Sequence, residues 1–107
     1  MSEDPQLRHR ALLEALRVAA LESPGHVDPE VRRAVAGRGN IPKAFTRYVG
    51  MIHDHAYRIT DRVLADMRRA GASEDEVFEV TVAAAYGAAG RRLDAGLDAL
   101  RAALEGR

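Results

Sequence analysis

The sequence predicts an all-α protein of about five to six helices, and three patterns carry that prediction. Apolar residues recur at three- and four-residue steps between residues 45 and 70, which places them on one side of a helix. Two Asp-Pro pairs and one Ser-x-x-Glu sequence have the form of helix starts. Four leucines near the C-terminus are spaced four, three and four residues apart, as in a helical seam.

Length and composition indicate a single domain spanning residues 1–107. Sixteen basic and sixteen acidic residues give a formal net charge of zero, which argues against a protein that binds nucleic acid by neutralising phosphates. The same balance leaves little charge repulsion between copies and favours self-association. No apolar run is long enough for a membrane span, and the acidic first residues do not resemble a signal peptide. We therefore expect a cytoplasmic protein with no membrane partner and no cofactor.

Two helices are expected before residue 40. The first begins at Pro5 with Asp4 as its cap, carries enough leucine to be half buried or more, and ends at residues 23–25. The second begins at the Asp28-Pro29 pair and stops at the glycines of residues 37–39. Those glycines lack the preceding strand and the Lys-Ser/Thr of a phosphate-binding loop, so an interhelix turn is favoured.

A long striped segment follows Pro42, with Asn40 as a candidate cap. Its unbroken stripe favours one continuous helix, whereas Thr60-Asp61 has the form of an internal cap and favours two helices. Both alternatives stay open at this point. The stripe comprises Phe45, Val49, Ile52, Ala56, Ile59, Val63, Met67 and Ala70.

The next helix begins at Ser73, whose hydroxyl and the Glu76 side chain form a predicted capping box. It runs into the small-residue segment 83–90, where a second helix can approach closely. A last helix is expected after the glycines, and its leucine seam either packs on the domain or closes a subunit interface. If the helix instead continues through Gly87 and Gly90, Arg91 and Arg92 are ordinary surface residues. The seam comprises Leu93, Leu97, Leu100 and Leu104.

Residues 70–77, which read Ala-Gly-Ala-Ser-Glu-Asp-Glu-Val, and the Ala-rich stretch 83–88 resemble the core of the carboxymuconolactone decarboxylase and alkylhydroperoxidase D (AhpD-like) family. The resemblance covers roughly the second half of the chain. It implies an AhpD-like helical bundle and a homo-oligomer, with trimers or dimer-based hexamers typical. In redox members, a Cys-x-x-Cys-x-x-x-His motif precedes the Ala-Gly turn, and its positions correspond here to Ala56, Ile59 and Val63.

These degenerate motif positions exclude the family's redox chemistry. Peroxide reduction there uses an attacking thiolate, a resolving thiol and a proton-transferring His. Ala56, Ile59 and Val63 supply none of these groups, and the chain has no cysteine at any other position. We therefore expect no thiol peroxidase activity.

The sequence His53-Asp54-His55 contains the usual ligand types of a metal site. On a helix, residues two apart point in nearly opposite directions, so the two His side chains cannot share an ion there. Asp54, Arg58, Arg62 and Asp66 recur every four residues and are interpreted as a solvated charge ladder. No metal site is predicted.

Several polar residues beside the stripe form the candidate site. Tyr48, His55 and Arg62 lie seven residues apart, and Tyr57, Arg58 and Tyr86 can approach them from neighbouring surfaces. In such a pocket His55 would act as a general base, or as a donor to an anionic ligand held by Arg58 or Arg62. The alternative is that the aromatic residues and His55 pack their rings at the edge of the core and expose their polar tips.

Three functions remain open from the sequence. The first is a redox-inactive AhpD-like protein that binds a small organic molecule or serves as an accessory subunit. The second is a decarboxylase- or isomerase-type enzyme that uses His55 with Tyr57 and Arg58. The third is a structural module that self-assembles or binds a partner through its helices.

Overall fold

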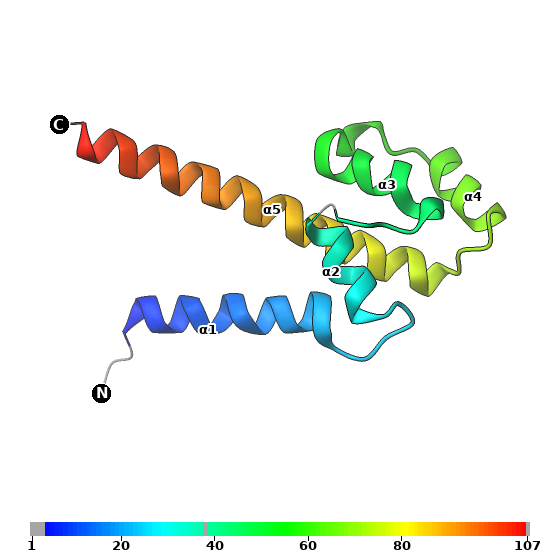
Figure 1. The fold of residues 1–107 in the computed structure, drawn as a ribbon, viewed down its shortest axis with the longest axis horizontal. Coiled ribbons are helices and arrows are strands. Elements are labelled where there is room, and N and C mark those ends of the chain that lie inside the picture. The colour runs from blue at the N-terminus through cyan, green and yellow to red at the C-terminus, as the bar shows by residue number, and fades with distance from the viewer. Residues whose placement is uncertain (1–3, 38, 107) are drawn as a thin grey trace.

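A computed structural model describes residues 4–37 and 39–106, and these residues contain helices but no strand. The all-α prediction is confirmed (Figure 1). Five α-helices are joined by one π-helical and one 3₁₀ turn. In order they are α1 (Pro5–Arg17), the π turn η1 (Val18–Glu22), α2 (Pro29–Gly37), α3 (Lys43–Asp54), the 3₁₀ turn η2 (Ala56–Arg58), α4 (Asp61–Arg69) and α5 (Glu74–Glu105).

Side-chain caps start three of the helices, as the sequence predicts. The Gln6 amide donates to the Asp4 carboxylate over 3.0 Å at the start of α1. At α5 the Glu76 amide donates to Ser73 Oγ over 3.1 Å, and the Ser73 amide donates to Glu76 Oε1 over 3.0 Å, which completes the capping box. The prediction for Asn40 is wrong, because α3 begins after Pro42 without a side-chain cap.

The long striped segment is two helices. α3 ends at Asp54 because His55 leaves the helical conformation, with φ −147° and ψ 52°. Thr60 then caps α4 by accepting from the Val63 amide over 3.4 Å. Most of the stripe still faces the core: Phe45, Val49, Ile52 and Met67 are buried, Ile59 and Val63 are half-buried, and Ala56 and Ala70 are exposed.

α5 is one continuous helix, so of the two alternatives the helix that continues through the glycines is the one observed, and no separate last helix begins there. Gly87 and Gly90 lie inside it, and Gly87 lets α2 cross at close range (Figure 1). A Cβ atom at position 87 would lie 2.0 Å from the carbonyl oxygen of Ala36, so only glycine fits this crossing. The predicted close approach at the small-residue segment is confirmed by this contact and by the burial of Ala83, Ala84 and Ala88.

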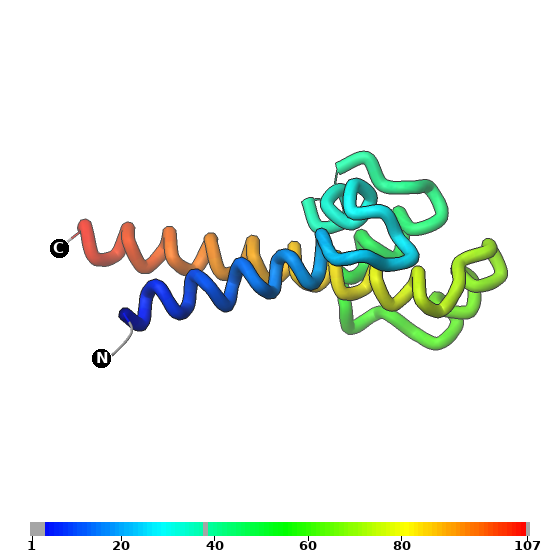
Figure 2. The backbone as a smooth tube through the Cα atoms, turned by 90° about the horizontal axis from the view of Figure 1, so that it is seen from below, coloured from blue at the N-terminus to red at the C-terminus, as the bar shows by residue number. Residues whose placement is uncertain are grey.

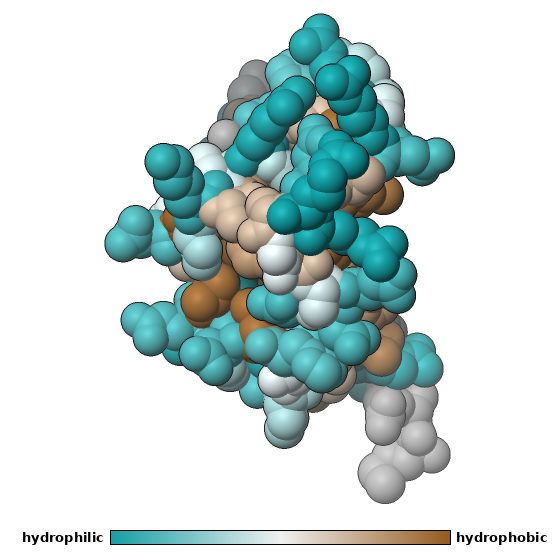
Figure 3. All heavy atoms as spheres, turned by 90° about the vertical axis from the view of Figure 1, so that its right-hand side faces the viewer, coloured by the Kyte–Doolittle hydropathy of each residue, from teal (hydrophilic) through white to brown (hydrophobic). Residues whose placement is uncertain are grey.

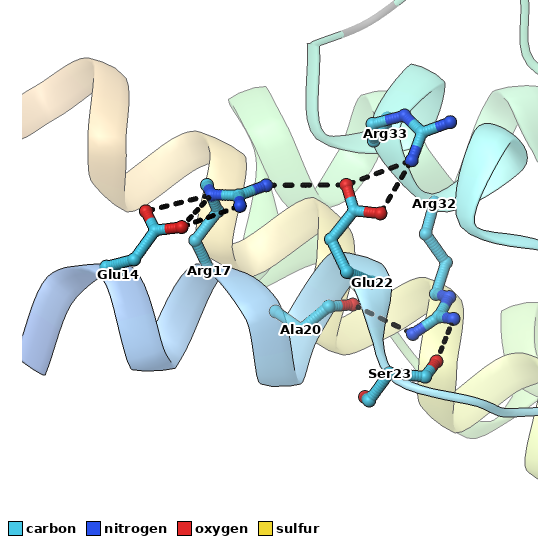
Figure 4. Close-up of polar contacts among 7 residues, drawn as sticks. All are labelled: Glu14, Arg17, Ala20, Glu22, Ser23, Arg32 and Arg33. Carbon is cyan, nitrogen blue, oxygen red and sulfur yellow. Dashed lines mark hydrogen bonds and ion pairs between the residues drawn. The ribbon is translucent and has the colours of Figure 1, made fainter.

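Buried polar groups fix the turn between η1 and α2. The Arg32 guanidinium is buried and donates to the carbonyl oxygens of Val27 over 3.0 Å, Ala20 over 3.5 Å and Ser23. It thereby satisfies carbonyl groups at the end of the first helical segment (Figure 4). In the same region Arg33 pairs with Glu22 over 2.7 Å, and Glu22 also contacts Arg17 over 3.3 Å. These contacts attach the base of α1 to α2.

Glu79 holds the same turn from the side of α5. Its carboxylate accepts from the backbone amides of His26 and Val27, over 2.8 Å and 3.0 Å. Burial alone would raise the pKa of Glu79, but the two amide hydrogen bonds together with the nearby His26 and Arg32 outweigh it and hold the pKa below its ordinary value of 4.5. The carboxylate is therefore stabilised in its charged form by the folded turn.

Two helical segments extend away from this core, and we call them the arms: α1 and the part of α5 at residues 91–105 (Figures 1 and 2). We call the remainder, residues 18–37 and 39–90, the head. α1 has no buried residue, so the prediction that it is half buried or more is wrong. The reason is its direction, since both arms run toward the chain ends on the side opposite α3 and α4. None of the described helices is long and apolar enough to cross a membrane.

Candidate functional site

The residues predicted to form one polar pocket lie in three separate places. Tyr48, on α3, is in the core and is only 4% exposed. Its hydroxyl lies 2.6 Å from Thr81 Oγ1, and the Thr81 hydroxyl donates to the Val77 carbonyl over 2.6 Å. Since the Thr81 proton is used, the Tyr48 hydroxyl is the donor to Thr81. Tyr48 therefore joins α3 to α5.

His55, Tyr57 and Arg58 lie on the surface at the break between α3 and α4. The rings of His55 and Tyr57 meet edge to face with centroids 5.9 Å apart, and Tyr57 Oη lies 3.5 Å from His55 Nδ1. Tyr57 is 78% exposed, and the Arg58 guanidinium lies 5.7 Å from its ring centre. This arrangement gives His55 no enclosed place in which to act as a general base.

Tyr86 lies at the other side of the head, where the arms begin. It lines a groove with Leu13 and Leu16 of α1 and with Leu93 of α5, and the groove has a volume of about 470 Å³. Most of the side chains around it are apolar. The structure thus places Tyr86 at the junction of the arms and brings it to no hollow shared with His55 or Arg62.

Arg58 and Arg62 are brought together in a hollow at the surface of α3, η2 and α4. Its volume is about 410 Å³. We call it the arginine hollow, and its lining consists of Arg47, Met51, Arg58, Thr60, Arg62, Val63 and Asp66. The sequence interpretation named Arg58 and Arg62 as ligand-binding candidates and missed Arg47, Met51 and Thr60.

The arginine hollow has an excess of positive charge. Its one carboxylate, Asp66, pairs with Arg69 on the same helix. Among residues 4–37 and 39–106, no carboxylate pairs with Arg47, Arg58 or Arg62. The predicted charge ladder is not a single helix face, because α3 ends at Asp54 before the ladder continues.

The positions that correspond to the family's redox motif differ in their surroundings. Ala56 is exposed in η2, whereas Ile59 and Val63 are half-buried and pack against the core. Val63 also forms part of the arginine hollow. With no cysteine in the chain, these positions provide an apolar surface and no thiol.

The two histidine side chains of the His53-Asp54-His55 sequence lie in different environments. His53 is buried, with Nε2 3.0 Å from the Val35 carbonyl oxygen, and His55 is exposed. No group of three or more potential metal ligands occurs in the part of the chain that the structure describes. Arg92, which lies within the continuous α5, donates to the His53 carbonyl over 3.3 Å and so contacts the last turn of α3.

No protein-family model, curated protein or solved structure matches this chain. The resemblance to the AhpD-like family therefore stays a prediction from the residues quoted above.

Proposed function

We propose that this protein is a self-associating helical module in which the arms of two copies pack together as a four-helix bundle. The exposed leucines of the arms carry the proposal. Each is between 46% and 62% exposed in the single chain, although leucine is among the residues most often found inside proteins. The set comprises Leu7, Leu12, Leu13, Leu16, Leu93, Leu97, Leu100 and Leu104.

The size of the exposed surface suits an interface between two copies. The radius of gyration is 16.5 Å, against about 13 Å for a compact domain of this length. The accessible surface is 7767 Å², whereas a compact protein of 11.7 kDa exposes roughly 5,900 Å². The excess of roughly 1,900 Å² is more than twice the 800 Å² or so that each partner buries in a standard interface.

The apolar residues of α1 also face in more than one direction. Leu13 and Leu16 line the groove toward α5, whereas Leu12 lines a separate hollow with Arg8. Leu7 borders that second hollow and also a hollow on the Tyr86 side. One neighbouring helix cannot cover both surfaces, so α1 needs neighbours on two sides. A bundle of four helices, two from each copy, provides them.

Charge favours a second copy of the same chain as the partner. The described part of α1 is basic, with three arginines against Glu14, and Arg8 and Arg10 make no described ion pair. The distal part of α5 carries three acidic and three basic residues, and Asp98 pairs with Arg101. Asp94 and Glu105 make no described ion pair, so they can lie beside Arg8 and Arg10 of the other copy.

The remaining functional hypotheses have less support from the geometry. His55 is exposed with Tyr57 outside the arginine hollow, which gives an acid–base enzyme no site that excludes water. Thiol peroxidase activity lacks its chemical groups because there is no cysteine. An accessory role of a redox-inactive AhpD-like protein is compatible with self-association, and that family assignment remains a prediction.

Mass measurements on single-site variants test the proposal. We expect wild-type protein to be a dimer, or an assembly of dimers, by native mass spectrometry and by light scattering after gel filtration. Leu97→Glu and Leu12→Glu should each give monomers, because both copies would have to bury the new charge. Phe78→Glu is the matched control: Phe78 is 68% exposed on the head part of α5, and its replacement should leave the mass unchanged.

Three results would overturn the proposal. A wild-type monomer at micromolar concentration would show that the leucines remain exposed. A trimer without a dimeric unit would exclude the two-fold bundle. Equal loss of assembly in Phe78→Glu would place the contact on the head and away from the arms.

A further inference from the structure

We propose that the arginine hollow binds a small organic anion, a molecule with a carboxylate or phosphate group attached to a compact apolar body. Three arginines from separate segments line this hollow: Arg47 from α3, Arg58 from η2 and Arg62 from α4. Its volume of about 410 Å³ falls within the usual range of about 300–1,000 Å³ for small-molecule sites.

The hollow has three arginines against one carboxylate, that of Asp66. Asp66 is engaged by Arg69, and no described carboxylate pairs with the three arginines. Like charges on neighbouring side chains repel each other, most strongly at low ionic strength. A bound anion would replace this repulsion with attraction, and a planar guanidinium matches a carboxylate or phosphate in two parallel hydrogen bonds.

The other lining groups favour an organic anion over an inorganic one. Met51 and Val63 supply apolar contact area, so they can hold the carbon part of a ligand. Thr60 accepts a hydrogen bond from the Val63 amide through Oγ1, which leaves its hydroxyl proton available to donate to the anion. The hollow thus combines cationic groups, an apolar wall and one neutral donor.

The break between α3 and α4 creates this arrangement. In a continuous helix Arg47 and Arg58 would be 11 residues and about 16 Å apart along the axis. Because η2 and Thr60 reverse the chain, the two arginines line one hollow. The hollow contains no residue of the arms, so its ligand binding and the self-association can be tested separately.

Nuclear magnetic resonance titrations test the proposal with defined probes. Backbone amide signals of residues 60–63 would be followed at low ionic strength while benzoate, acetate, inorganic phosphate or neutral benzamide is added. We expect saturable shifts with benzoate, weaker binding of acetate, and no saturation with benzamide. Arg47→Gln and Arg62→Gln should each raise the dissociation constant for benzoate about tenfold, since each removes a charge-assisted hydrogen bond.

Arg68→Gln is the matched control. Arg68 lies on α4 outside the hollow and pairs with Glu74 over 3.2 Å, so its loss removes the same charge from the same helix. The control should change the benzoate dissociation constant less than twofold. Equal weakening in the control, equal binding of benzamide, or no saturable shift with benzoate would each overturn the proposal.

Discussion

The head and the arms are built from similar apolar residues and reach opposite degrees of burial. In the head, Val35, Val49 and Val80 are fully buried, and small residues fill the spaces between helices. In the arms, every leucine remains about half exposed. The difference shows that apolar content alone does not bury a helix; a partner must also lie within reach.

The two regions differ in what their helices meet. α5 contacts α2 where Gly87 permits close approach, and the chain itself supplies the partner. Beyond residue 90 the same helix continues without a break but leaves the head behind (Figure 2). The opposite end of the molecule is mainly hydrophilic, with smaller apolar patches (Figure 3). The apolar surface without a partner is therefore concentrated in the arms.

The largest expected effect is a loss of stability in the head. Gly87→Ala would place a methyl group against the Ala36 backbone, and we expect a loss of about 3 kcal/mol in the free energy of unfolding. Gly50→Ala, within α3, is the control because a Cβ atom there meets nothing within 4 Å. It should stabilise the protein by about 0.5–1 kcal/mol. Chemical denaturation measures both values, and similar effects of the two would refute the close crossing.

A second comparison removes apolar groups from both regions. Val80→Ala should lower the free energy of unfolding by about 2 kcal/mol, because it opens a cavity in the fully packed head. Leu100→Ala removes more atoms but from an exposed position, and at concentrations where the chain is monomeric we expect a change below about 0.5 kcal/mol.

Protein concentration sharpens that comparison. The effect of Leu100→Ala on the melting temperature should grow as concentration rises, since association stabilises the folded state by mass action. The effect of Val80→Ala should not depend on concentration in this way. A Leu100→Ala effect that is large in the dilute monomer would mean that the arm already has a partner within its own chain.

The smallest expected effect concerns Glu79, which fastens the turn at the edge of the head. Its pKa is lowered in the folded state, so its carboxylate stabilises the fold above about pH 5. That contribution is lost as the pH falls through 4.5 and then through the folded pKa. Glu79→Gln should therefore lose about 1 kcal/mol at pH 7, and the loss should shrink as the pH falls below 4.5. A difference from wild type that grows on acidification would contradict this assignment.

Patterns within a few residues predicted where the helices begin. They did not predict how the helices are oriented relative to one another. Asp4, Thr60 and Ser73 act as caps because a cap depends on residues within one turn. The burial of α1 could not be inferred, because an amphipathic helix has the same sequence pattern whether its partner belongs to its own chain or to another. α5 continues through Gly90 because the residues before and after it keep the helix intact, and a glycine inside a helix lowers the stability only slightly.

In the candidate site, too, local spacing was predictable and the meeting of distant segments was not. Arg62 was recognised from its seven-residue spacing to His55, and Arg58 was expected to approach from a neighbouring surface. Arg47 was missed because its approach depends on the chain reversal at residues 55–60. Tyr48 was grouped with His55 by helical spacing, yet Tyr48 lies in the core and His55 lies beyond the end of α3. Tyr86 was expected to approach His55 from a neighbouring surface, but the fold places it beside the arms.

The sequence by itself determined that the chain is helical, where most helices begin, and that these residues include no cysteine thiol. These properties follow from short-range spacing and from the residue types present. Only the tertiary structure decided that α1 and the end of α5 leave the head, and that Arg47 meets Arg58 and Arg62. Both outcomes depend on how helices are oriented after a turn, and that orientation is set by contacts between residues distant in the sequence.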